Sequence, residues 1–177
     1  MIEQGFAELS MRGLARSLGM SPGNLSYYYS SKTDLIEDLC AFVLQPYLEE
    51  FERLRQPTSE RSPLEQLRAV IEFVYSDLSQ QETTHFFPEL WVLALRDEAA
   101  AAQMEKIYAT YRLVLAELIA GARPDLDDQT VEDLALTISA AIEGHTVFVG
   151  HGRSHVDRSR PIGALITEQL TRMVEHA

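Results

Sequence analysis

The sequence predicts an all-α protein that consists of a helix-turn-helix head and a larger helical body. Apolar residues recur at three- and four-residue spacing through the long segments, and no segment alternates with period two over the length of a strand. Turn-forming residues separate these segments, most clearly at residues 56–62. The chain of 177 residues is long enough for both parts. We expect the head to span residues 1–45 and the body residues 46–177.

Residues 10–29 carry the signals of two short helices joined by a tight turn. Ser10 can cap the first helix, and Gly19 can end it in the left-handed conformation. Ser21 can cap the second helix, with Pro22 at its first position. Two helices joined by such a short turn form the helix-turn-helix unit, whose second helix enters the major groove of DNA. The pattern therefore predicts a DNA-reading head.

The second of these helices has one side for the core of the head and another for DNA. Leu25 and Tyr29 are four residues apart and should face the core. Tyr27 and Tyr28 can donate hydrogen bonds to phosphates, and Asn24 can bond a phosphate or the edge of an adenine. Consecutive tyrosines in a short exposed helix are hard to explain by core packing alone, so this side is the expected contact surface.

Residues 10–35 read SMRGLARSLGMSPGNLSYYYSSKTDL. This stretch resembles the DNA-binding signature of the TetR family of transcriptional repressors. In that family a lysine at the position of Lys32 binds a phosphate at the start of the next helix, and a tyrosine usually stands at the position of Ser26. Together with the motif, the resemblance implies that the residues that contact DNA are Ser10, Arg12, Ser21, Pro22, Gly23, Asn24, Ser26, Tyr27, Tyr28 and Lys32.

Two functions remain open at this point. The resemblance implies a ligand-responsive regulator, most simply a repressor, that binds a double-stranded DNA operator as a homodimer and releases it when a small effector binds. In the family a full helix precedes the two DNA-reading helices, and residues 1–4 stand where its last turn would be. Without that helix the core of the head would lack one wall. The alternative is a dimeric small-molecule- or partner-binding protein that has lost DNA binding through the incomplete head.

The net charge of −12 resides in the body. Residues 1–33 contain Arg12, Arg16 and Lys32 against only two acidic residues. A head with so small a positive excess should bind DNA weakly without sequence preference, because non-specific affinity depends on phosphate neutralisation. Specific contacts must therefore provide more of the binding.

The remaining helices are predicted from apolar periodicity and from capping residues. A long helix over residues 32–55 links the head to the body. Residues 80–84 interrupt the helical pattern, and Pro88 opens a short helix. Asp127 or Asp128 can cap a later helix. The expected body helices span residues 63–78, 88–95, 98–120, 128–149 and 161–175.

The last two helices have wide apolar stripes, and small residues such as Ala140, Ala141 and Gly144 would allow another helix to approach closely. Either both helices pack only on their own body, or two from each chain form a four-helix interface with two-fold symmetry, as the resemblance implies. We favour the dimer, because two half-sites on DNA require two-fold symmetry. The expected interface residues are Ile138, Ile142, Val149, Ile162, Leu165, Ile166, Leu170 and Met173.

Aromatic residues are concentrated in the central body helices, with two histidines among them. Aromatic residues at helical spacing usually form a core, but a helical body lined in this way can also hold an apolar pocket with a few polar anchors. The resemblance favours a pocket for a small effector, which we expect near Trp91. The expected ligand-binding residues are Tyr75, His85, Phe86, Trp91, Tyr108, Tyr111, His145 and Phe148.

Composition and motifs argue against several other classes of protein. No apolar run is long enough for a membrane span, and no secretory leader is recognisable. Cys40 is the only cysteine, which fits a cytoplasmic protein, and its apolar neighbours favour an inert core thiol. His151 and His155 lie in a polar loop without a further metal ligand, and catalytic and nucleotide-binding motifs are absent from the sequence. We expect no enzymatic activity, no metal and no cofactor.

Overall fold

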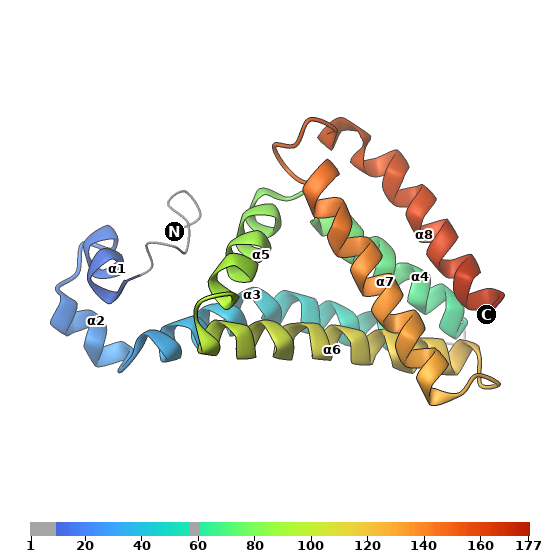
Figure 1. The fold of residues 1–177 in the computed structure, drawn as a ribbon, viewed down its shortest axis with the longest axis horizontal. Coiled ribbons are helices and arrows are strands. Elements are labelled where there is room, and N and C mark those ends of the chain that lie inside the picture. Colours follow the sequence, from blue (N-terminus) through green and yellow to red (C-terminus); the bar gives the residue numbers. More distant parts are fainter. Residues whose placement is uncertain (1–9, 57–60) are drawn as a thin grey trace. The chain divides into compact units, whose positions relative to one another are not determined.

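The computed structural model describes residues 10–56 and 61–177 and is all-α, as the sequence predicts. The described residues form helices and connecting turns without an extended β-strand. The predictions for residues 1–6 and for the tip of the loop at 57–60 lie outside the described residues. In chain order the helices are α1 (Met11–Ser17), α2 (Pro22–Tyr28), α3 (Lys32–Arg55), α4 (Pro63–Asp77), α5 (Gln81–Ala94), α6 (Glu98–Ala122), α7 (Asp128–Val149), the 3-10 helix η2 (Val156–Arg158) and α8 (Ser159–Glu175) (Figure 1).

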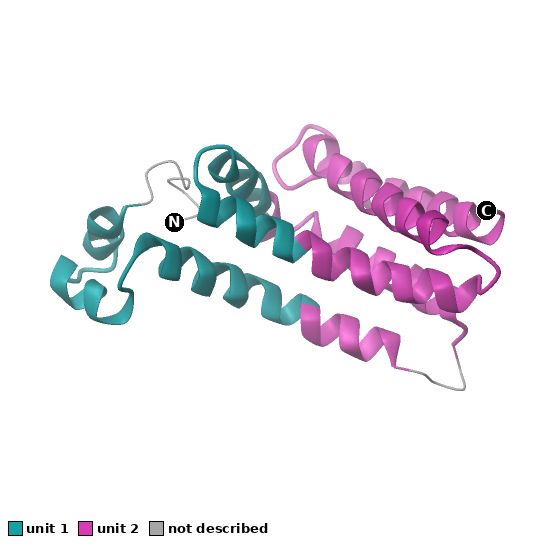
Figure 2. Cartoon of the chain, turned by 60° about the horizontal axis from the view of Figure 1, so that its bottom comes forward, with its two compact units in different colours: residues 1–47, 85–107 teal, residues 48–84, 108–177 magenta. Residues whose placement is uncertain are grey.

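The chain forms two compact units (Figure 2). Unit 1 comprises residues 1–47 and 85–107, and unit 2 comprises residues 48–84 and 108–177. Unit 1 thus contains the helix-turn-helix, and unit 2 contains all of α4, α7 and α8. Helices α3, α5 and α6 contribute residues to both units. The domain boundary after residue 45 stays a prediction.

Local capping signals set the starts of α4 and α7, and the cap of α7 is one of the two residues that the sequence predicts. The backbone N–H of Ser62 donates to Glu65 Oε2 at 2.7 Å, and that of Glu65 donates to Ser62 Oγ at 3.3 Å, with Pro63 at the first helical position. Asp127 Oδ1 accepts from the backbone N–H of Thr130 at 2.7 Å. Each cap gives a partner to a backbone donor that the first turn of a helix leaves free.

The break between α4 and α5 covers residues 78–80, so the predicted interruption at residues 80–84 extends too far, and the predicted helix start at Pro88 is wrong because α5 begins at Gln81 and contains Pro88. Thr84 explains the difference, because its side chain is buried and its Oγ1 donates to the backbone oxygen of Leu78 at 2.8 Å. A threonine whose hydroxyl has a partner at the end of the preceding helix can be buried at little cost. The polar stretch that reads as a loop is therefore a packed first turn.

In unit 2, α8 packs along α4 (Figure 1). Gly163 of α8 lies against the ring of Tyr75, because a Cβ at this position would come within 2.4 Å of two ring carbons. Only glycine permits this approach of backbone to ring. The large apolar side chains in this unit that are almost entirely removed from solvent include Leu67, Val70, Ile71, Leu115, Ile119, Ile138, Ile142 and Val174.

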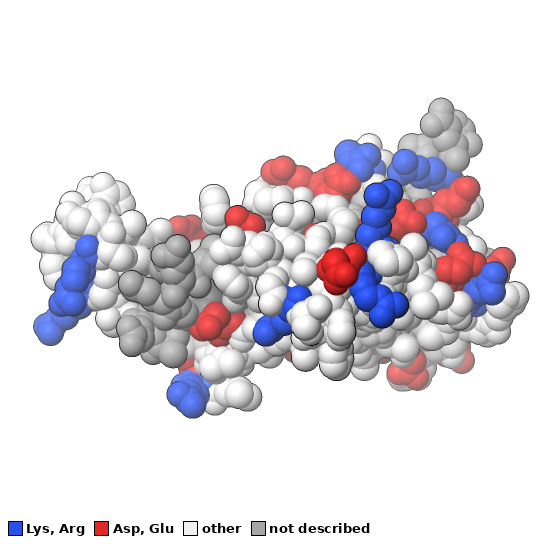
Figure 3. Space-filling model, turned by 90° about the horizontal axis from the view of Figure 1, so that it is seen from above, with Lys and Arg blue, Asp and Glu red and all other residues white. Residues whose placement is uncertain are grey.

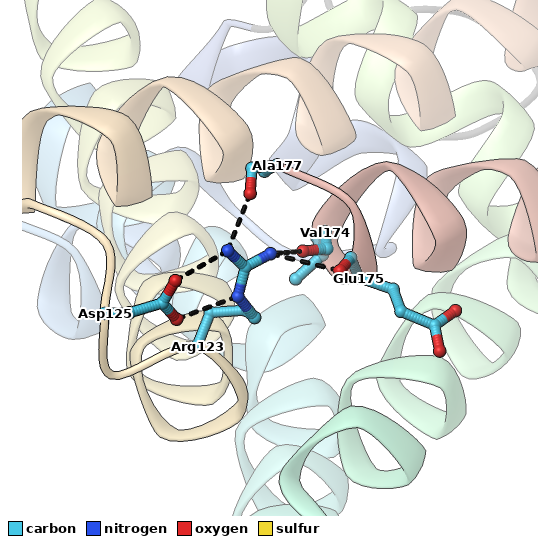
Figure 4. A network of polar contacts seen from close by, with 5 residues as sticks. All are labelled: Arg123, Asp125, Val174, Glu175 and Ala177. Carbon is cyan, nitrogen blue, oxygen red and sulfur yellow. Dashed lines mark hydrogen bonds and ion pairs between the residues drawn. The ribbon is translucent and has the colours of Figure 1, made fainter.

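Arg123 joins the turn after α6 to the C-terminal end of α8 (Figure 4). Its guanidinium donates to the two carboxylate oxygens of Asp125 at 2.9 and 2.8 Å, which holds the pKa of that carboxyl down at about 2. It also donates to the backbone oxygens of Val174, Glu175 and Ala177 at 2.9, 3.1 and 2.6 Å. The last carbonyl groups of a helix have no intrahelical donors, so Arg123 supplies the donors that the end of α8 lacks.

None of the helices in the described residues is long and apolar enough to cross a membrane. Cys40 is buried, and burial raises the pKa of its thiol to about 11. A thiol with so high a pKa stays protonated near neutral pH and is a poor nucleophile. The prediction of an inert core thiol is therefore confirmed.

Candidate nucleic-acid interface and effector site

The helix-turn-helix of unit 1 is built by the local signals that predict it. Ser10 Oγ accepts from the backbone N–H of Gly13 at 3.0 Å at the start of α1. Ser21 Oγ accepts from the backbone N–H of Asn24 at 3.1 Å at the start of α2. Gly19 has a φ of 65°, the left-handed conformation in which a helix commonly ends. The predicted caps, turn and helix starts are confirmed.

The two helices are held by a small apolar core. Leu14, Ala15 and Leu25 are buried together with Leu35 from the start of α3. Tyr29 packs against this cluster, as predicted, and its hydroxyl donates to Asp38 Oδ2 at 2.5 Å. The core fixes the rotation of α2 about its axis, so the opposite side of α2 is exposed.

That exposed side of α2 carries the residues expected to contact DNA. Tyr27 and Tyr28 are 84% and 65% exposed, and their rings meet edge to face with centroids 5.4 Å apart. Gly23 has open space where a Cβ would stand, so a DNA backbone could approach closely. The structure also exposes the remaining members of the expected set on α1, α2 and their caps: Ser10, Arg12, Ser21, Pro22, Asn24 and Ser26.

The helix-turn-helix itself contains basic residues and no acidic residue. Residues 10–31 contain Arg12 and Arg16 but no aspartate or glutamate. The blue side chains at the left of Figure 3 accordingly lie among uncharged ones. A surface of this kind attracts phosphate, although two arginines alone give only a modest electrostatic contribution.

The start of α3 is stabilised by a reciprocal pair of hydrogen bonds. The backbone N–H of Ser31 donates to Asp34 Oδ2 at 3.1 Å, and that of Asp34 donates to Ser31 Oγ at 3.1 Å. Hydrogen bonds from Ser30 and then Ser31 lower the pKa of the Asp34 carboxyl. This capped first turn holds Lys32, the first residue of α3.

Lys32 forms an ion pair that the sequence did not reveal. Its Nζ lies 3.1 Å from Asp97 Oδ2, and the two side chains are 37% and 24% exposed. The other oxygen of Asp97 accepts from the backbone N–H of Ala100 at 3.1 Å and so caps α6. The pKa of Asp97 is lowered by this backbone hydrogen bond and by Lys32. Asp97 before a predicted helix is a visible capping signal, but its contact with Lys32 depends on tertiary structure.

In unit 2, two tyrosines of α6 interact with Glu143 of α7. Tyr108 and Tyr111 are three apart on α6, and Glu143 and Thr146 are three apart on α7, so each pair lies on one side of its helix. Tyr108 hydrogen-bonds to the Glu143 carboxyl, and burial raises the pKa of that carboxyl to about 7. Burial, and then the charge of Glu143, raises the pKa of Tyr111, whose ring stacks on Phe51 with centroids 5.7 Å apart.

We call Tyr108, Tyr111, Glu143 and Thr146 the α6–α7 polar cluster. Two of its members, Tyr108 and Tyr111, belong to the expected ligand-binding set. The expected set omits Glu143 and Thr146, because a glutamate and a threonine on a helix with many apolar residues give no sign of burial in the sequence.

The other expected ligand-binding residues do not join this cluster. Tyr75 packs edge to face on His145 with centroids 5.2 Å apart, next to Gly163. Phe148 is 65% exposed on α7, so the prediction that it lines an internal pocket is wrong. His85, Phe86 and Trp91 belong to unit 1, where Phe86 packs on Phe87, and their role stays a prediction.

The outer face of α7 and α8 is apolar and largely exposed among the described residues. On α7 it comprises Leu136, Ala140, Gly144, Val147 and Phe148, all exposed, and on α8 it comprises the exposed Leu165 with the half-buried Ile162, Ile166 and Met173. A Cβ at Gly144 would meet nothing within 4 Å. We call this surface the α7–α8 face.

Four of the expected interface residues lie elsewhere. The structure buries them within the single chain, so their assignment to the dimer interface is wrong; they are Ile138, Ile142, Val149 and Leu170. The apolar stripe of α7 is wide enough to have two sides, and the side that contains Ile138 and Ile142 packs into the core of unit 2.

Comparison with known proteins agrees with this architecture. Residues 1–39 match the family described as bacterial regulatory proteins, tetR family, and residues 63–175 match the BetI-type transcriptional repressor, C-terminal family. An HTH-type transcriptional regulator in the dhlA 5′ region of Xanthobacter autotrophicus is 27% identical over 179 residues, which cover 94% of this chain and 83% of that protein.

Two solved structures share the fold at low sequence identity. Salmonella enterica GusR has a TM-score of 0.70 at 22% identity over 98% of this chain and 88% of its own. The ketosteroid transcriptional regulator KstR2 of Mycobacterium tuberculosis has a TM-score of 0.65 at 17% identity over 95% of this chain and 87% of its own. With the two family matches, which cover most of the sequence, the chain belongs to the TetR family and is a ligand-responsive DNA-binding transcriptional regulator.

Proposed function

We propose that the protein is a repressor that binds a two-fold DNA operator as a homodimer and releases it when a small effector binds in unit 2. The helix-turn-helix supports the DNA-binding part most directly. A buried core holds α2 so that Tyr27, Tyr28 and Asn24 are exposed together, with Arg12 on the adjacent helix. Hydroxyl, amide and guanidinium groups on one exposed surface are those that contact phosphates and base edges.

The α7–α8 face supports the homodimer. An exposed glycine inside a helix costs about 1 kcal/mol relative to alanine, and among the described residues no atom would lie within 4 Å of a Cβ at Gly144 and so require glycine there. A helix of a second chain could approach this face closely, because glycine has no side chain in the way. Two copies of the face related by a two-fold axis would bury their leucine and valine side chains in one interface and present two helix-turn-helix units to two half-sites.

A salt-dependent gel shift on the DNA upstream of the gene tests this function. We expect specific binding that weakens steeply as salt increases. Lys32→Ala should weaken binding and reduce the salt slope by about 1, because one phosphate contact is lost. Tyr28→Phe, which removes only a hydroxyl, should weaken binding without changing the dimer. Lys106→Ala removes the same charge from α6 and serves as the matched control.

Failure to bind any part of the upstream DNA, with an intact dimer, would contradict the proposal. That result would favour the alternative, a dimeric small-molecule- or partner-binding protein without DNA binding. An Lys32→Ala protein with unchanged affinity and salt slope would instead contradict only the assignment of Lys32 as a phosphate ligand.

The ion pair between Lys32 and Asp97 gives a further prediction for DNA binding. Asp97→Asn should raise operator affinity about two- to fivefold at low salt, because an exposed ion pair worth up to about 1 kcal/mol no longer competes with phosphate for Lys32. Asparagine caps helices about as well as aspartate, so α6 should be unaffected. The gain should disappear when Lys32→Ala is added. Equal or lower affinity of Asp97→Asn in the gel shift would exclude this competition.

A further inference from the structure

We infer that the α6–α7 polar cluster is the anchor for a primary or secondary ammonium group on a small, partly apolar effector. This inference deepens the proposed function, because it names the chemistry of the effector that binds in unit 2. It concerns the polar end of the ligand, which would bind to the carboxyl group of Glu143 and to the hydroxyl groups of Tyr111 and Thr146.

The first observation is that several buried polar side-chain atoms lack partners among the described residues, and that three of them belong to this cluster. Glu143 Oε2, the Tyr111 hydroxyl and Thr146 Oγ1 are removed from solvent and have no hydrogen-bond partner among the described residues. Tyr108 hydrogen-bonds to the same carboxyl group and thereby holds it in place. Since buried polar groups in folded proteins nearly always have partners, three such atoms on two helices of unit 2 need an explanation.

Thr146 differs from two other helical threonines of this chain and, like the buried Thr167, lacks a partner for its hydroxyl among the described residues. Thr137 and Thr171 donate from Oγ1 to the carbonyl oxygen four residues earlier, at 2.7 and 2.8 Å. This is the usual way in which a helical threonine satisfies its hydroxyl. Thr146 makes no such bond among the described residues although it is almost completely buried. Its hydroxyl is therefore available to a ligand next to Glu143.

The chemistry of the cluster selects the ligand class. Carboxylate and hydroxyl oxygens accept hydrogen bonds, and a buried carboxylate also needs a compensating positive charge. An ammonium group with N–H donors meets both needs at once. The tyrosine rings add a face that attracts cations, and Phe51 stacked on Tyr111 provides an apolar wall. A carboxylate or phosphate ligand would be repelled by Glu143, and a neutral alcohol would leave its charge uncompensated.

Three probes of equal chain length test the inference by isothermal titration calorimetry on the full chain. They are hexylammonium, which has charge and N–H donors, hexyltrimethylammonium, which has charge without donors, and 1-hexanol, which has a donor without charge. We expect saturable binding of hexylammonium, at least about tenfold tighter than either of the other two, because a charge-assisted hydrogen bond is lost in each comparison. Absence of saturable hexylammonium binding would overturn the inference, as would equal affinity for hexanol or for hexyltrimethylammonium.

Glu143→Gln locates the site. It should weaken hexylammonium binding by about tenfold or more and leave hexanol binding unchanged, because the amide keeps the shape of the side chain and removes the charge. Glu132→Gln, at an exposed position of the same helix, is the matched control and should leave all three affinities unchanged. An unchanged hexylammonium affinity in Glu143→Gln would place any amine site elsewhere and overturn the inference.

Calorimetry and the gel shift separate this inference from the proposed function. If hexylammonium binds through Glu143 but the protein binds no upstream DNA, the inference stands and the repressor proposal fails. If DNA binds specifically but hexylammonium does not bind, the repressor proposal stands and the inference fails.

Discussion

Glu143→Gln is expected to stabilise the ligand-free protein by about 3 kcal/mol at about pH 8 and to have little effect at about pH 4. Burial raises the pKa of Glu143 from its ordinary value of 4.5 to about 7, so the folded protein holds this proton more tightly than the unfolded chain does. The stability that comes from the neutral form is complete below about pH 4.5 and is lost as the pH rises through about 7. Glutamine resembles the neutral form and cannot lose a proton.

Urea unfolding of both proteins at a series of pH values, at one protein concentration, measures this difference. Tyr108 and Tyr111 of α6 interact with Glu143, and the phenol groups of tyrosines ordinarily titrate near pH 10, which is above this range. The exposed Glu132→Gln should show no such pH dependence. A stability difference between Glu143→Gln and the unmodified protein that stays constant from acid to alkaline pH would show that Glu143 is not neutral in the folded state.

A variant that gains stability and loses amine affinity would show why the sequence retains a buried acid. A carboxylate that reduces stability near neutral pH is expected where binding of a ligand requires it, since stability and function commonly conflict at such sites. A gain in stability together with a loss of hexylammonium affinity in Glu143→Gln would therefore support the effector site, and the absence of both would weaken it.

Val147→Glu is expected to convert the dimer into monomers at micromolar concentration and to reduce operator affinity by about a hundredfold or more. Val147 is 57% exposed on the α7–α8 face, so the glutamate should not disturb the fold of the single chain. In a two-fold interface the change places two like charges near one another and buries both. The operator affinity falls because each half-site would then be bound by an independent monomer.

Sedimentation velocity and the gel shift measure the two effects of Val147→Glu. Leu113→Glu is the matched control, because Leu113 is 59% exposed but lies on α6, outside the α7–α8 face. If the unmodified protein sediments as a monomer at micromolar concentration, the dimer itself is excluded. If Val147→Glu remains a dimer, the interface lies on another surface.

The helix-turn-helix is the part of the molecule that could be predicted most completely from sequence. Its defining contacts connect residues three or four apart, as in Ser10 with Gly13 and Ser21 with Asn24. The free backbone N–H groups at a helix start donate to a capping side chain that lies only a few residues away, so the capping residue can be identified from the sequence. The capping box before α4 is equally local, although it is not among the caps predicted from the sequence. The start of α5 depends on Thr84, whose partner lies at the end of the preceding helix.

The sequence by itself determined the family, the all-α fold and the residues that α2 exposes, because caps, turns and 3/4 periodicity are local properties. Tertiary structure alone decided which contacts connect distant segments. Lys32 meets Asp97 only when α3 and the start of α6 come together, and Glu143 becomes a buried acid only when α6 covers it. Packing also decided which side of α7 faces inward. Both sides are apolar, and only contact with the other helices of unit 2 buries Ile138 and leaves Val147 exposed.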